Sequence, residues 1–241
     1  MEQRGQTFSA AHMLGRAGSC QDHWSPDLKG QPTKNEIFCC LDDAAGAGFA
    51  LALAAQNAAG KPWLWVQDQQ SRRQSGMPYI HGLPQSIRHN LHYIAAQSPE
   101  DALFAMEEGL KCAGLLFVIG ELSGDPKALG FTASRRLAVA SEAHGVPLYL
   151  LRADAQRQLS AARMRWEVAV APSLPHRWDN RAPGTPQVQA ELFRTRLYRP
   201  GRWWITHEEG KLSVATQVYS PNSVDLVAPA GDQPLAASGW G

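Results

Sequence analysis

Apolar runs of strand length alternate with helical patterns between residues 37 and 151. Most of these runs are apolar at every position, which is typical of strands in a parallel sheet that helices cover on both faces. The predicted strands are 37–41, 62–67, 89–95, 115–119 and 147–151. The predicted helices are 46–59, about 99–112 and 132–144. The pattern therefore predicts an α/β fold with a mostly parallel central sheet.

Helix-end signals support two of these helices. Ser98 precedes Pro99 and the acidic pair Glu100-Asp101, the order expected for an N-cap, a first-turn proline and first-turn acids. Thr132 is the expected N-cap of the later helix, and Gly145 is its expected C-cap.

The pattern changes after residue 152. The segments 165–170, 188–197 and 202–206 alternate between apolar and polar residues, which predicts antiparallel strands with one face exposed to water. We expect three regions: a loosely ordered N-terminal arm at 1–35, an α/β core at 36–215, and a C-terminal tail at 216–241.

Charge is balanced overall but uneven along the chain. Of 241 residues, 23 are basic and 22 acidic, yet 152–202 contains ten arginines, no lysine and four acidic residues. Such a segment suits weak, sequence-independent contacts with DNA or phosphate, and the alternative is a solvated sheet face. The candidate contacts are Arg163, Arg165, Arg194, Arg196, Arg199 and Arg202.

Cysteine usage and hydropathy point to the cytoplasm. The four cysteines form no C-x-x-C pair, and Cys20-x-x-His23 lacks the second pair that a zinc site needs. We see no signal-peptide pattern and no apolar run of membrane-spanning length. We expect a cytoplasmic protein with reduced thiols, no metal and no contact with a membrane.

The segment after the first strand has the outline of a nucleotide-binding loop. A phosphate-binding loop reads G-x-x-x-x-G-K-[ST], in which backbone N–H groups, the lysine and the hydroxyl hold the phosphates and Mg²⁺. Here Gly46 is followed by Ala47 and Gly48, and Gly48 is followed by Phe49 and Ala50. Neither register supplies a lysine or a hydroxyl. We interpret Gly46, Ala47, Gly48 and Phe49 as a degenerate nucleotide loop.

Two acidic residues lie where an ATPase would need them, beyond the carboxyl ends of neighbouring strands. Asp68 follows the second predicted strand, and Glu121 follows Gly120 at the end of the fourth. Glu121 is displaced by one residue along its strand, and a carboxylate displaced in this way points to the opposite face of the sheet. We treat both Asp68 and Glu121 as vestigial acidic positions. Without the lysine, phosphoryl transfer loses its main source of positioned charge. We expect no enzymatic activity and no cofactor.

Several segments resemble the ImuA (inducible mutagenesis protein A) family. The resemblance covers about residues 35–210 and consists of weak motifs in the right order. The motifs are DALFAMEEGL at 101–110, LFVIGELSG at 116–124, TASRRLAVASEAHGVPLYLLR at 132–152, RMRWEVA at 163–169, ELFRTR at 191–196 and PGRWW at 200–204.

That resemblance implies a RecA-like fold, shared with the cell-division inhibitor SulA. It also implies an accessory role in error-prone translesion synthesis during the SOS response to DNA damage. The implied partners are an ImuB-like homologue of Y-family polymerases, an error-prone C-family DNA polymerase, and RecA.

Two other hypotheses stay open. The chain could instead be a SulA-like division inhibitor that binds a filament-forming GTPase, or a DNA-stimulated ATPase with an atypical loop. The length, the arginine-rich segment and the proline loop at 172–186 favour the ImuA interpretation over the SulA one.

Overall fold

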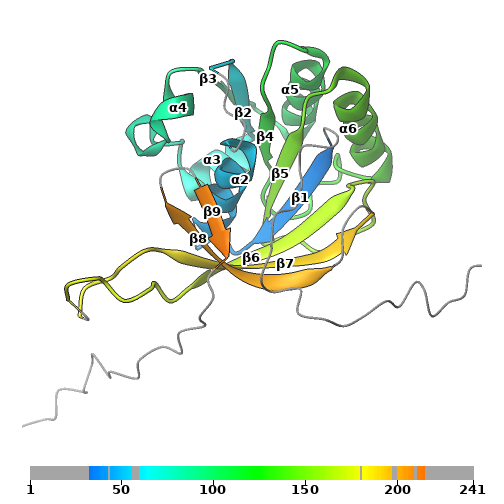
Figure 1. Ribbon diagram of the computed structural model, residues 1–241. Coiled ribbons are helices and arrows are strands. Elements are labelled where there is room, and N and C mark those ends of the chain that lie inside the picture. Colours follow the sequence, from blue (N-terminus) through cyan, green and yellow to red (C-terminus); the bar gives the residue numbers. More distant parts are fainter. Residues whose placement is uncertain are drawn as a thin grey trace, which may run out of the picture.

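The described part of the chain forms one nine-stranded sheet with helices on both faces (Figure 1). The computed structural model describes residues 33–42, 44–55, 60–179, 181–196, 200–208 and 211–214. The strands are β1 (Lys34–Cys39), β2 (Trp63–Gln67), β3 (Leu91–Ala95), β4 (Val118–Glu121), β5 (Leu148–Ala153), β6 (Met164–Ala171), β7 (Gln187–Thr195), β8 (Gly201–Glu208) and β9 (Lys211–Val214). The helices are α2 (Ala45–Ala55), α3 (Gln69–Ser75), η1 (Ile80–Gly82), α4 (Gln85–Arg88), α5 (Pro99–Lys111) and α6 (Phe131–His144).

The sheet has a parallel part and an antiparallel part. Its order is β3-β2-β4-β5-β1-β6-β7-β8-β9, and every pairing from β3 to β6 is parallel. The three pairings from β6 to β9 are antiparallel. The prediction of a RecA-like α/β core, with a mostly parallel sheet and antiparallel strands toward the C-terminus, is confirmed.

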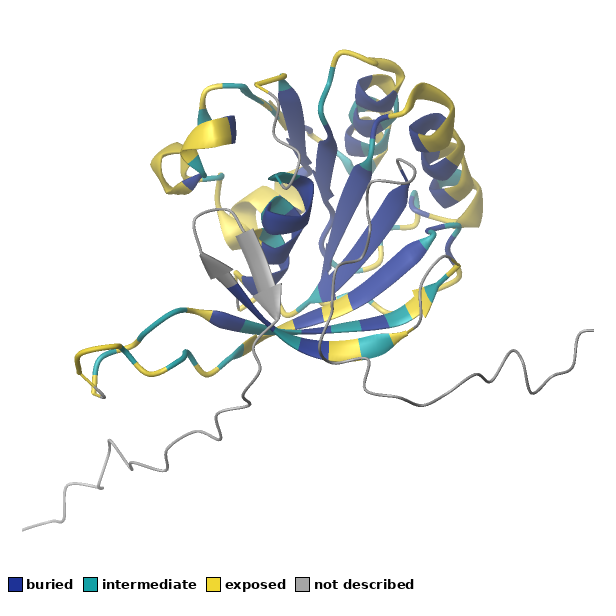
Figure 2. Ribbon diagram, viewed as in Figure 1, coloured by how far each residue is buried: buried dark blue, intermediate teal, exposed yellow. Residues whose placement is uncertain are grey.

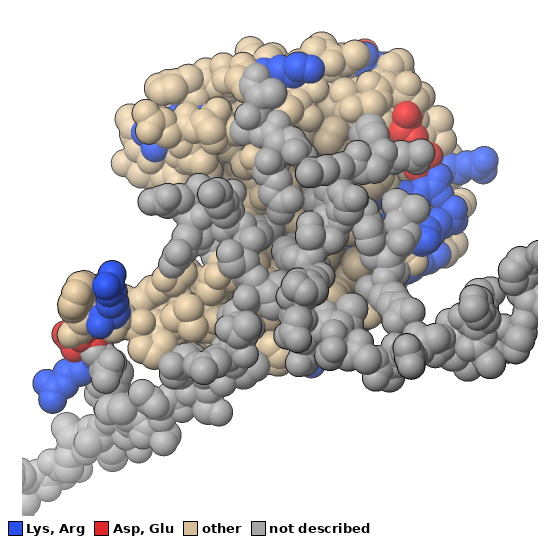
Figure 3. Space-filling view, in the orientation of Figure 1, with Lys and Arg blue, Asp and Glu red and all other residues tan. Residues whose placement is uncertain are grey.

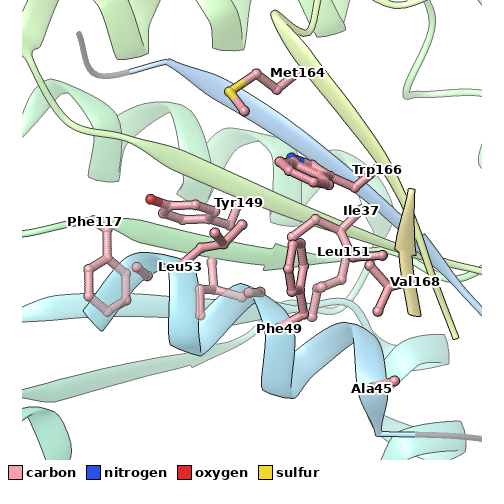
Figure 4. Packing of buried hydrophobic residues seen from close by; sticks show 14 of the residues in the cluster. Ile37, Ala45, Phe49, Leu53, Phe117, Tyr149, Leu151, Met164, Trp166 and Val168 are labelled. Carbon is pink, nitrogen blue, oxygen red and sulfur yellow. The ribbon is translucent and has the colours of Figure 1, made fainter. Parts of the chain in front are cut away.

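Helices cover both faces of the parallel part. Helix α2 packs on one face, where Phe49 meets Trp166 at 5.1 Å between ring centroids (Figure 4). Helices α5 and α6 pack on the other face, where Met106 and Leu137 lie among Leu64, Val118 and Leu150. The central strands are consequently buried along almost their whole length (Figure 2). This burial explains why most of their positions are apolar, although β1 begins with the buried polar residues Lys34, Asn35 and Glu36.

The antiparallel strands bury one face only. Trp166, Ala190 and Trp203 face α2 and belong to the same core cluster as Phe49. The opposite face carries charged residues such as Glu191. The predicted one-face-wet strands are therefore confirmed.

One of the predicted helix caps is wrong. Ser98 caps α5 by accepting a hydrogen bond from the backbone N–H of Asp101, and Gly145 ends α6 with left-handed backbone, as expected. However, α6 begins at Phe131, so Gly130 is its N-cap and Thr132 lies inside the first turn. Nearby, β1 begins at Lys34, two residues before the expected start of the core. Residues 1–32 of the predicted arm and the predicted tail at 216–241 lie outside the described residues.

Candidate functional site

The carboxyl ends of β1, β2, β4 and β5 surround a pocket of about 330 Å³. The loop after β1 contributes Leu41 and Asp42, β2 contributes Trp65 and Gln67, and β4 contributes Glu121. This edge of a parallel sheet is where open α/β folds place their ligands. Strand ends that are far apart in the sequence therefore converge on one hollow, as the sequence suggested.

The two glycines of the degenerate nucleotide loop lie in a helix and not in the turn before it. Helix α2 begins at Ala45, one residue before the predicted start of this helix, so Gly46 and Gly48 are part of its first turn and residues 46–49 do not form a loop. A Cβ atom at Gly46 would lie 2.5 Å from Cys39 Sγ, whereas one at Gly48 would meet nothing within 4 Å. Gly46 thus allows α2 to pack closely against β1.

The other two residues of that loop have different surroundings. Phe49 is buried against Trp166 and does not line the pocket. Ala47 does line the pocket, with a side chain that offers no hydrogen bond to a ligand. Helix α2 therefore presents a smooth apolar surface to the pocket.

Asp68 has a structural role in the fold. Its carboxylate is buried and accepts a hydrogen bond of 2.8 Å from Ser71 N, which makes it the N-cap of α3. Ser71 Oγ in turn lies 3.1 Å from Ser123 Oγ and so connects α3 with the segment after β4. Asp68 is occupied by this cap and is not among the residues that line the pocket.

Glu121, by contrast, lines the pocket. Contrary to the expectation that its displacement would turn it away, its carboxylate lies on the α2 face of the sheet with Trp65. Oε2 accepts hydrogen bonds from Gln67 Nε2 at 2.7 Å and from Trp65 Nε1 at 3.3 Å, and Oε1 accepts one from Ser75 Oγ. Burial raises the pKa of the Glu121 carboxyl above its usual value, although these three donors oppose the shift.

The charge of the pocket is unsuited to phosphate. Its two ionisable side chains other than cysteine are Asp42 and Glu121, and no lysine or arginine from the described residues lines it. A nucleotide triphosphate needs cationic partners for its phosphates. No group of three or more histidine, cysteine, aspartate or glutamate residues in the described ranges is arranged to hold a metal ion.

Three of the candidate DNA-contacting arginines form ion pairs within the chain. Arg165 is 4% exposed, and its Nε lies 2.9 Å from Glu36 Oε2. Arg163 pairs with Glu142, and Arg202 Nη2 lies 2.6 Å from Glu191 Oε2. Arg165 is therefore unavailable to DNA.

The remaining candidates are Arg194, Arg196 and Arg199. Arg194 and Arg196 are exposed at the end of β7 and form no ion pair with another described residue, while Arg199 lies outside the described residues. Figure 3 shows basic side chains gathered at the edge of the molecule on the α6 side, with acidic side chains among them. Because three of the candidate arginines are paired with acidic residues, the surface of segment 152–202 is less basic than the sequence of this segment indicates.

The comparisons with known proteins agree with the resemblance seen in the motifs. The chain is 31% identical over 155 residues to Protein ImuA from two strains of Caulobacter vibrioides, NA1000 / CB15N and ATCC 19089 / CIP 103742 / CB 15. The comparison confirms the resemblance to the ImuA family. The match covers 60% of this chain and spans 59% of the length of these relatives. No family model matches the chain.

None of the described helices has both the length and the hydropathy to cross a membrane.

A buried polar network was missed by the sequence reasoning. Lys34 Nζ lies 2.9 Å from Glu36 Oε1 and 2.7 Å from Ser134 Oγ, and Ser160 Oγ donates to Glu36 Oε1 at 2.6 Å. Two of the segments that carry the ImuA resemblance, 132–152 and 163–169, supply Ser134 and Arg165. The available signal was Lys34-x-Glu36, two opposite charges on the same face of one strand.

The pKa values of this network follow from burial and from mutual pairing. Burial lowers the pKa of Lys34, despite the attraction of Glu36. Burial acts in the opposite direction on Glu36, but Lys34, Ser160 and Arg165 together hold the pKa of its carboxyl below the usual value. Glu36 is therefore the anion that compensates the buried positive charges of Lys34 and Arg165.

Proposed function

We propose that this chain is a non-catalytic accessory protein of damage-induced, error-prone translesion DNA synthesis, and that it acts through protein–protein contacts. The similarity to Protein ImuA supports the process, although the chain spans only 59% of the length of those relatives. The partners we propose are an ImuB-like homologue of Y-family polymerases, an error-prone C-family DNA polymerase and RecA.

The observation that carries the non-catalytic part is the chemistry of the pocket at the carboxyl edge. Asp42 and Glu121 line it, Ala47 stands on the helix that would face the phosphates, and no lysine or arginine from the described residues enters it. Phosphoryl transfer depends on cations placed around the phosphates. In this proposal the fold is retained for its binding surfaces.

The test is affinity capture of the full-length, tagged chain from cells of its own species after DNA damage. We expect the translesion polymerases to be recovered, and undamaged cells to give much less of them. Recovery of a filament-forming GTPase in their place would favour the SulA-like alternative. Recovery of neither class would contradict the proposed role.

A parallel assay tests the absence of catalysis. The purified chain is incubated with Mg²⁺ and ATP, with and without single-stranded DNA, and phosphate release is measured. We expect no release above the level of a heat-denatured sample. DNA-stimulated release that Glu121→Gln abolishes would support the atypical ATPase instead.

A further inference from the structure

The pocket at the carboxyl edge has the chemistry of a cation site. We propose that it binds the guanidinium or ammonium group of an arginine or lysine carried on an apolar segment of a partner protein. The inference rests on the proposed function, because it names the chemistry by which this sheet edge would recognise a partner.

Charge complementarity is the first argument for a cationic occupant. Asp42 is exposed at the mouth, Glu121 is buried in the wall, and the described lining contains no basic residue that could neutralise either. A buried carboxylate without a cation is costly, and an incoming guanidinium would relieve that cost. An anionic ligand would raise it.

The hydrogen bonds around Glu121 keep its carboxylate in place. Gln67 Nε2 donates to Glu121 Oε2 at 2.7 Å, and Gln67 Oε1 accepts from the Tyr93 hydroxyl at 2.7 Å. Gln67 is therefore fixed at both ends of its amide and cannot easily turn its oxygen toward Glu121. Trp65 Nε1 adds a further donor. An ordered carboxylate loses little side-chain entropy when it pairs with a ligand.

The rim of the pocket supplies the apolar part of the surface. Met77 and Pro78 line the pocket, and the chain continues into Tyr79 and Ile80. Met77 is 64% exposed, Tyr79 72% and Ile80 51%, which is unusual for three large apolar residues within four positions. Aromatic residues and methionine are enriched at protein interfaces. The rim thus suits the apolar neighbours of a basic side chain.

The size of the pocket fits one side chain. Its volume of about 330 Å³ is at the small end of the range for ligand pockets. The described residues offer no metal-binding cluster as an alternative use for its acidic and thiol groups. A basic side chain from a partner is the occupant that agrees with charge, rim and volume together.

The experiment uses three dipeptide amides as probes: acetyl-Leu-Arg-amide, its neutral isostere acetyl-Leu-citrulline-amide, and acetyl-Leu-Glu-amide. Each is titrated into the full chain by calorimetry at low salt. We expect the arginine probe to bind about tenfold more tightly than the citrulline probe, the ratio that corresponds to about 1.4 kcal/mol. The glutamate probe should not bind, and added salt should weaken the arginine probe.

Two variants locate the site, and one serves as a control. Asp42→Asn removes the exposed carboxylate without touching the core, and Glu121→Gln removes the buried one. Each should weaken the arginine probe by about tenfold or bring it level with citrulline. Glu100→Gln makes the same change at an exposed position of α5 and should have no effect. Circular dichroism verifies that every variant is folded, and Asp42→Asn keeps the test valid if Glu121→Gln fails to fold.

Three results would overturn the inference: no binding of the arginine probe, equal binding of arginine and citrulline probes, or binding that Asp42→Asn leaves unchanged. The capture experiment separates this failure from that of the proposed function. If the chain captures translesion polymerases yet ignores the arginine probe, only the cation site is wrong. If it captures none, the proposed function is wrong whatever the probe does.

Discussion

Lys34 Nζ lies 2.9 Å from Glu36 Oε1, and Arg165 Nε lies 2.9 Å from the other oxygen of the same carboxylate. All three side chains are buried. One carboxylate therefore balances two cations in a region that water does not reach, while Ser134 and Ser160 satisfy the remaining hydrogen-bonding groups of Lys34 and Glu36. Because two buried cations share one carboxylate, loss of Glu36 should cost more stability than loss of Lys34.

We expect Glu36→Gln to destabilise the protein far more than Lys34→Met. Loss of the carboxylate leaves two buried cations uncompensated, which should lower the free energy of unfolding by about 3–5 kcal/mol. Lys34→Met leaves the Glu36–Arg165 pair balanced and deprives the two serines of one partner, so its cost should be about 1–2 kcal/mol. Urea unfolding followed by circular dichroism measures both. An equal or larger loss in Lys34→Met would show that Lys34 holds the network together.

The glycines of α2 give a second pair of opposite effects. Gly46→Ala places a Cβ 2.5 Å from Cys39 Sγ and 2.8 Å from Cys39 Cβ, and this overpacking should cost about 1–3 kcal/mol. Gly48→Ala meets nothing within 4 Å and should stabilise the helix by up to about 1 kcal/mol. Thermal unfolding of both variants measures the difference. If Gly46→Ala is as stable as the wild type, close packing of α2 on β1 is not the reason for this glycine.

The parallel sheet could be predicted because most of its strands are buried on both faces and consequently contain runs of apolar residues, as in 147–151. The glycine at position 46 could not be explained in the same way. Gly46 and Gly48 are typical turn residues, and only the contact between Gly46 and Cys39 explains why a glycine lies inside a helix.

The location of the candidate site at the carboxyl edge of the sheet could be predicted from the sequence, but the hydrogen bonds within the site could not. The order of strands and the edge rule identify the ends of β1, β2 and β4, and Glu121 does lie there. Its hydrogen bonds with Trp65, Gln67 and Ser75 join residues 46 to 56 positions apart. The number of arginines available to contact DNA was overestimated for the same reason. Glu142, which pairs with Arg163, lies 21 residues away in the sequence, and Glu36, which pairs with Arg165, lies 129 residues away. A count of charges within one segment cannot include such distant partners.

For the arginine segment we expect weak DNA binding that depends on Arg194 and Arg196. These residues are exposed at the end of β7, whereas Arg163 and Arg202 are engaged with Glu142 and Glu191. The double variant Arg194→Glu/Arg196→Glu should abolish the binding, and the wild-type affinity should fall steeply as salt rises. Fluorescence anisotropy with a labelled single strand measures both.

A control for that experiment makes the same change of charge elsewhere. Lys61→Glu/Lys127→Glu alters two exposed basic residues outside the arginine segment, and it should retain most of the affinity. If both double variants lose binding equally, the wild-type signal comes from overall charge and Arg194 and Arg196 form no site.

The last prediction concerns Glu121 and the pH dependence of stability. Burial raises the pKa of this carboxyl in the folded chain, and the negative charge of Asp68 adds to the effect of burial, against the hydrogen bonds from Ser75, Gln67 and Trp65. The folded state therefore binds a proton more tightly than the unfolded state, in which the usual value of 4.5 applies. The contribution of Glu121 to stability is fully present below pH 4.5 and is lost as the pH rises through the folded-state value.

The variant Glu121→Gln carries no such proton. The unfolding free energy of the wild type minus that of the variant should therefore decrease as the pH rises from 4 toward neutrality, roughly the range in which a buried carboxyl titrates. Urea unfolding at a series of pH values measures this difference, with Glu100→Gln as the matched change at an exposed site. A difference that stays constant with pH would mean that the hydrogen bonds from Ser75, Gln67 and Trp65 cancel the cost of burial. A difference that grows with pH would mean that they outweigh it, and that Glu121 is ionised more easily in the folded chain than in the unfolded one.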